Sequence, residues 1–78
     1  MVIGFVLMNV SPLYEYKVFN KLSKLPEVIE LHPLFGEYDL IVKIEAKDYE
    51  SIAQIIIHKI KTINGIIDTK TLTGIRLH

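Results

Sequence analysis

The sequence contains no cysteine, so no disulfide can stabilise the fold and no zinc or iron–sulfur site can be built on thiolates. This absence matters in a chain of 78 residues. A domain of this size buries only about 60 to 65 per cent of its unfolded surface, and its stability alone is marginal. Small domains usually gain the missing stability from a staple or a partner. We therefore expect a partner subunit.

Arginine is almost absent as well. The single arginine is Arg76, and the nine basic and nine acidic side chains give a formal net charge of zero. No stretch clusters lysine or arginine densely enough to follow a phosphate backbone. We therefore expect no direct binding to nucleic acid.

Long apolar runs are missing too, although half of the residues are hydrophobic. No run approaches the roughly 20 apolar residues that a membrane-spanning helix needs. The N-terminal stretch lacks the basic start and the small-residue cleavage site of a secretion signal. The expectation is a soluble, cytoplasmic protein with no membrane partner.

The polar residues do not form a recognisable metal or catalytic motif. His32, His58 and His78 fall on an expected strand, an expected helix and the last position, with no pair at i, i+4 spacing. Ser11 has no set of His and Asp arranged around it. We predict no metal, no cofactor, no catalytic residues and no enzyme activity.

A repeat is visible when the sequence is shifted against itself by 38 residues, which aligns residues 21–36 with residues 59–74. In each half an amphipathic helix leads into a strand. The matched pairs are Lys21 with Lys59, Ile29 with Ile67, Leu34 with Leu72 and Gly36 with Gly74.

Helix boundaries are marked by capping residues. Ser11 as N-cap and Pro12 at the first helical position predict the start of the first helix, and Pro26 ends it. Asp48 predicts the N-cap of the second, and Gly65 suits its left-handed C-terminal cap. The apolar stripes are Tyr14, Val18, Leu22 and Leu25 in the first helix, and Ile52, Ile56, Ile60 and Ile63 in the second.

The strands are recognised by alternation with period two. Residues 39–46 alternate in this way, and Ile29, Leu31 and Phe35 share one side of the preceding strand, where Pro33 favours a sheet edge. The order strand, helix, strand, strand, helix, strand predicts an α+β fold, the ferredoxin-like βαββαβ sandwich. Its antiparallel four-stranded sheet has the order 4-1-3-2, with two helices on one face.

The first strand is apolar on both faces. Val6 and Met8 lie on one side, and the other side carries Ile3, Phe5 and Leu7, which Ile41 of the third strand joins. Helices can cover only one side, and monomers seldom tolerate an exposed apolar patch of this size. We predict a homodimer whose interface includes Ile3, Phe5, Leu7 and Ile41.

The turn between the second and third strands reads GEYD, residues 36–39. Gly36 can adopt a positive φ angle there without steric cost. Asp39 can bond nearby backbone N–H groups, which is the structural explanation of its presence. A ligand-binding role is the other explanation, and the turn alone does not choose between the two.

The Gly-x-Tyr-Asp turn runs into DLIVKIEAKD, and INGIIDTKTLTG follows later in the chain. In this order and spacing the sequence resembles the amino-acid-sensing (RAM) domain of the Lrp/AsnC transcription regulators, over nearly all of its length. In that family the domain dimerises and assembles further, commonly into tetramers of dimers. Amino acids bind in pockets between the dimers.

The resemblance implies a ligand site on the turn and the last strand. Gly36, Glu37 and Tyr38 would lend backbone groups, and Asp39 its carboxylate to the ammonium of a free amino acid. Thr69 and Thr71 would offer hydroxyls. Strand residues with β-branched side chains are common, so the strand itself also accounts for the threonines.

Family members usually carry an N-terminal helix-turn-helix domain, whereas here the first strand starts at residue 2. We therefore expect one stand-alone domain over residues 1–78, without a DNA-binding domain, that modulates full-length regulators. Two alternatives stay open. One is an oligomerisation module with no ligand, and the other is a cofactor-free dimeric monooxygenase, which would need a cavity where Ile and Leu are expected to pack.

Overall fold

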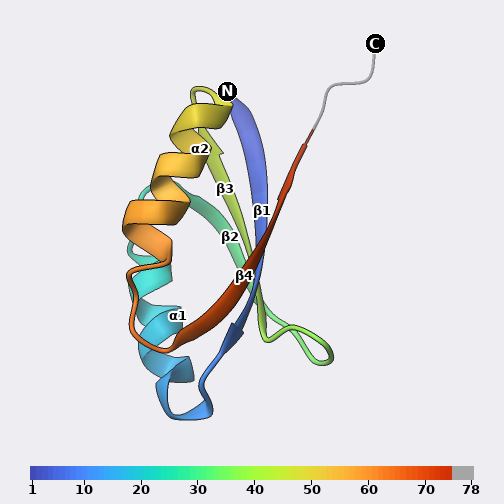
Figure 1. Ribbon diagram of the computed structural model, residues 1–78, viewed down its shortest axis with the longest axis vertical. Helices are drawn as coiled ribbons and strands as arrows, with labels where there is room; N and C mark the ends of the chain where they lie inside the picture. Colours follow the sequence, from blue (N-terminus) through green and yellow to red (C-terminus); the bar gives the residue numbers. More distant parts are fainter. Residues whose placement is uncertain (75–78) are drawn as a thin grey trace.

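The computed structural model describes residues 1–74 (Figure 1), so Arg76 and His78 lie outside the described part. In chain order the elements are β1 (Val2–Val10), the 3-10 turn η1 (Pro12–Tyr14), α1 (Glu15–Ser23), β2 (Val28–Pro33), β3 (Leu40–Ala46), α2 (Tyr49–Ile55), the π-helical segment η2 (Ile56–Ile60) and β4 (Ile66–Thr73). Within residues 1–74 no helix is long and apolar enough to cross a membrane.

The strands form one antiparallel sheet in the order β2-β3-β1-β4, which confirms the predicted topology. Both helices lie on the same face of the sheet (Figure 1). The strand that carries Pro33 is at an edge of the sheet, as expected, because proline has no backbone N–H to donate to a neighbouring strand.

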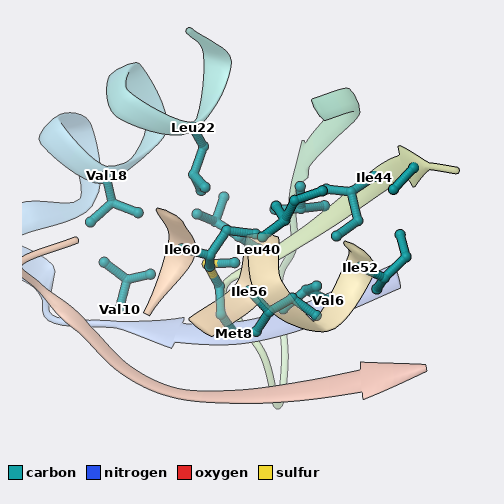
Figure 2. Close-up of a cluster of buried hydrophobic side chains, with 13 residues drawn as sticks. Val6, Met8, Val10, Val18, Leu22, Leu40, Ile44, Ile52, Ile56 and Ile60 are labelled. Carbon is teal, nitrogen blue, oxygen red and sulfur yellow. The ribbon is translucent and has the colours of Figure 1, made fainter. Parts of the chain in front are cut away.

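The core lies between the helices and this inner face of the sheet. In β1 and β3 every second side chain is buried, which is the pattern of strands covered on one face. Val18 and Leu22 of α1, and Ile52 of α2, close over them and are at most 2% exposed (Figure 2). Each fully buried side chain of this kind contributes roughly 1.5 to 3 kcal/mol from removal of apolar surface from water.

The two predicted helix caps differ in whether the side chain makes the capping hydrogen bond. The Asp48 carboxylate accepts a hydrogen bond of 2.8 Å from the Ser51 N–H, which confirms the cap. Hydrogen bonding from the Ser51 side chain, and then from its backbone N–H, lowers the pKa of Asp48. Ser11 occupies the N-cap position of the 3-10 turn η1, with Pro12 at its first position as expected, but its hydroxyl makes no capping bond and α1 begins only at Glu15. The 3-10 turn explains this, since the Tyr14 N–H already donates to the Ser11 carbonyl at 2.9 Å.

Phe35 is not part of a strand, which corrects the expectation that it continues the second one. Strand β2 ends at Pro33, and the Leu34 N–H donates to the Asp39 carbonyl at 2.8 Å, so the chain turns away from the sheet. Phe35 is therefore fully exposed in the connection 34–39.

The outer face of the sheet has no helix over it (Figure 1). Pairing in register places Phe5 between Lys43 of β3 and Leu72 of β4, and Leu7 beside Ile41. The Lys43 ammonium lies 5.9 Å from the centroid of the Phe5 ring. Lys43 also donates to Glu30 at 3.3 Å, and His32 lies 3.1 Å from the same carboxylate. This face thus has an apolar centre and a charged rim on the β2 side.

An ion pair connects the segment before β2 to η2. The Lys59 ammonium donates to Glu27 Oε2 at 2.6 Å, while Glu27 Oε1 is buried and has no hydrogen-bond partner within residues 1–74. The hydrogen bond from Lys59 holds the pKa of Glu27 below its usual value. A side chain that is charged and largely enclosed in this way depends on its partner.

Two glycines have positive φ angles, Gly36 at 140° and Gly65 at 104°. A Cβ atom at Gly65 would overlap the Tyr14 side chain, whereas nothing lies within 4 Å of one at Gly36. We expect Gly65→Ala to lower the free energy of unfolding by about 3 kcal/mol or more and Gly36→Ala by about 1 to 2 kcal/mol. Urea denaturation of both variants measures the difference, and equal losses would mean that backbone strain alone matters.

The Glu27–Lys59 pair predicts a dependence of stability on pH. Because the pKa of Glu27 is lowered from 4.5 in the folded state, the pair stabilises the fold above about that pH and the stabilisation is lost on further acidification. Lys59→Met should reduce stability at pH 7 and flatten the curve of unfolding free energy between about pH 6 and pH 3. Parallel curves for the two proteins would contradict this role.

Candidate ligand-binding site

Asp39 stands at the base of the hairpin 34–39, held by three hydrogen bonds. Its N–H donates to the Met8 carbonyl at 2.9 Å, and its carbonyl accepts from Leu34. Its carboxylate oxygen Oδ2 accepts from the Val10 N–H at 2.8 Å. The structural role expected for Asp39 is therefore present. The second oxygen, Oδ1, has no hydrogen-bond partner in the described part of the chain.

The rest of the GEYD turn extends outward from Asp39. Gly36 adopts the positive φ angle that was predicted, and both Gly36 and Glu37 are exposed, while Tyr38 is half-buried. The hairpin projects past the sheet on the side away from the helices (Figure 1). Its backbone groups are thus accessible to a ligand or to another subunit.

A hollow of about 460 Å³ lies between this hairpin and the start of the first helix. Apart from Glu15 and Asp39 its walls are apolar or aromatic, and no Lys, Arg or His of the described residues lines it. The walls are Pro12, Leu13, Glu15, Tyr16 and Phe19 on one side and Pro33, Leu34, Asp39 and Leu40 on the other.

The helix side of this hollow was not predicted from the sequence. Leu13 and Tyr16 are 91% and 79% exposed, although a solvent-facing position normally carries a polar residue. These two residues lie off the apolar stripe of the first helix, and that mismatch is the signal by which the hollow could have been found.

Thr69 and Thr71 point toward the helix side of the sheet, because they pair with Met8 and Val6. Asp39 bonds to the opposite edge of β1, so Thr69 lies two strand spacings away, about 10 Å. Thr71 lines a smaller hollow of about 230 Å³ between α2 and β4. A single chain therefore does not bring the threonines and Asp39 into one pocket.

The core packing and the His, Asp and Glu side chains of residues 1–74 bear on the enzyme and metal alternatives. Between the helices and the sheet the core side chains of residues 1–74 are at most 8% exposed, which is the dense packing expected where a monooxygenase would need its cavity. The same residues contain no group of three His, Asp or Glu placed to hold a metal ion.

The chain is similar to known proteins over nearly its whole length. The family described as Lrp/AsnC ligand binding domain matches residues 3–76. An uncharacterized HTH-type transcriptional regulator of Pyrococcus abyssi is 34% identical over 74 residues, which are 91% of this chain and 49% of the regulator. The chain thus spans about half the length of this relative. A homocitrate synthase of Sulfurisphaera tokodaii is 39% identical over 61 residues, which are 78% of this chain but 13% of that enzyme.

Solved structures agree with this assignment. The crystal structure of FFRP-DM1 is 40% identical and superimposes with a TM-score of 0.91, covering 96% of this chain and all of that one. The transcriptional regulator NMB0573 of Neisseria meningitidis, solved as a complex with L-Met, has a TM-score of 0.88 over 96% of this chain and 50% of its own. At 16% identity it shows the shared fold alone. By sequence and by fold, the chain belongs to the Lrp/AsnC ligand-binding domain family.

Proposed function

We propose that the chain is an amino-acid effector-binding and oligomerisation module that acts in the cytoplasm on transcription regulators of the Lrp/AsnC type without contacting DNA itself. The observation that carries the proposal is the state of Asp39. One carboxylate oxygen accepts from the Val10 N–H, the other has no hydrogen-bond partner within residues 1–74, and Asp39 is one of the residues that line an apolar hollow.

A carboxylate fixed in this way is suited to bind an ammonium group. Its orientation is set before the ligand arrives, so little conformational freedom is lost on binding. A hydrogen bond between two charged groups is also about twice as strong as a neutral one. The exposed turn of Gly36, Glu37 and Tyr38 supplies backbone groups for the rest of the amino acid.

In this proposal the site is completed by a second copy. Thr69 and Thr71 cannot reach the Asp39 of their own chain, so their hydroxyls serve a ligand held by another subunit. The complex of NMB0573 with L-Met supports an amino acid as the ligand. The match to about half of a longer regulator supports such a regulator as a partner of the assembly.

The outer face of the sheet is proposed as the dimer interface. Ile3, Phe5, Leu7 and Ile41 occupy its centre on the two central strands, and Leu72 extends it onto β4. An apolar centre with a charged rim is the usual anatomy of a protein interface. A copy packed on this face would remove from water the apolar surface that the helices leave uncovered.

A thermal-shift screen against the twenty amino acids tests the ligand. A ligand at about 100 times its dissociation constant adds roughly 2.7 kcal/mol, which raises the melting temperature of a domain of this size by about 10 °C or more. Asp39→Asn should abolish the shift and keep the melting temperature of the free protein, because the Asn carbonyl oxygen can still accept from Val10. Asp39→Ala should abolish the shift and also lower the melting temperature of the free protein, because the hydrogen bond from Val10 is lost as well.

No shift with any amino acid, for a protein that still assembles, would reject the sensor and leave an oligomerisation module. A shift that persists in Asp39→Asn would place the ligand elsewhere on the surface.

The dimer is tested by Phe5→Glu, which puts a charge at the centre of the outer face. We expect light scattering at micromolar concentration to report a dimer or larger species for the natural protein and a monomer for this variant. Ile57→Glu is the matched control, because Ile57 is 49% exposed on the helix layer. A monomeric natural protein, or an unchanged assembly in Phe5→Glu, contradicts the interface.

A further inference from the structure

We infer that the hollow between η1 and the hairpin is a binding site for a small primary amine with an apolar body and no carboxylate, complete within one chain. The inference rests on the proposed role of Asp39 as an ammonium acceptor. It adds a second class of ligand and a site that needs no second copy.

The charges of the hollow select a cation. Glu15 and Asp39 both line it, and neither is in an ion pair within residues 1–74. No basic side chain of the described residues stands among its walls. Glu15 also lies in the first turn of α1, where its charge offsets the partial positive charge of the helix N-terminus. A ligand carboxylate would therefore meet two negative groups and no basic side chain to neutralise it.

The walls select an apolar body. Leu13, Phe19, Leu34 and Leu40 surround the space, and Tyr16 adds an aromatic ring. Exposed Leu13 is costly to leave in water, and covering it favours a ligand with an aliphatic or aromatic group. The volume of about 460 Å³ is within the range of small-molecule pockets.

An amine and the amino acid from which it derives need different groups of the protein for binding. The ammonium of either can bind Asp39 Oδ1, which the hairpin and Val10 hold in place. Only the amino acid needs donors for its carboxylate, and the hollow supplies no basic side chain for that purpose. The amine therefore binds to a single chain, whereas the amino acid also needs donors for its carboxylate from a second chain.

Calorimetric titration of the dilute protein with matched compounds tests this selectivity. The series is 3-methylbutylamine, leucine and 4-methylpentanoate, which share one isobutyl group and differ only in the charged group or groups. The repulsion of one carboxylate by two others predicts that the amine binds roughly tenfold more tightly than leucine, and that 4-methylpentanoate does not bind.

Three variants assign the site. Glu15→Gln should weaken binding of the amine several-fold and lower the thermal stability only slightly, because Glu15 is exposed and only its interaction with the helix N-terminus is lost. Asp39→Asn should abolish amine binding while the hydrogen bond from Val10 is kept. Glu50→Gln is the matched control, since Glu50 is an exposed acid in the first turn of α2 that does not line the hollow, and the amine affinity of this variant should not change.

The outcomes separate the two proposals. Leucine binding as tightly as the amine or more tightly, or Glu15→Gln without effect on the amine, overturns the amine site and leaves the amino-acid proposal standing. Amine binding with no shift from any amino acid supports this site and overturns the proposed effector. If none of the three compounds binds, the amine site is overturned, and the screen of the twenty amino acids alone decides the proposed effector.

Discussion

The central strand β1 carries apolar side chains on both faces, whereas two helices can cover only one of them. On the inner face Val6 and Met8 are completely buried. On the outer face Phe5 and Leu7 remain half-buried under nothing but their strand neighbours. The positions of the two helices depend on this constraint. The helix stripes cover the inner face, and the uncovered outer face is the surface that we propose for a second subunit.

The end of β1 joins segments that are far apart in the sequence. Val10 donates to the Asp39 carboxylate and so fixes the hairpin. The next residue, Ser11, donates to the Gly65 carbonyl at 2.7 Å and so fixes the turn that enters β4. Because the first helix also begins here, a ligand bound beside Asp39 would contact both the hairpin and the helix start.

Much of the fold was predictable because the strand pattern and the turn residues agree with one another. The alternation in β3, the Asp48 cap and the positive φ angles of Gly36 and Gly65 each correspond to the structure. The capping hydrogen bond expected at the start of the first helix was not found. Ser11 was expected to cap a helix, but a 3-10 turn had already used the N–H that its hydroxyl would bind.

The sequence by itself determined the order of the elements and the faces that are buried, since both follow from short-range periodicity and local turn chemistry. It also marked Asp39 as unusual. Only the tertiary structure decided which groups Asp39 contacts, because its partner Val10 is 29 residues away and the walls of the hollow come from two separate segments, within residues 12–19 and 33–40. Contacts of that range depend on how the layers pack, and no local pattern in the chain encodes them.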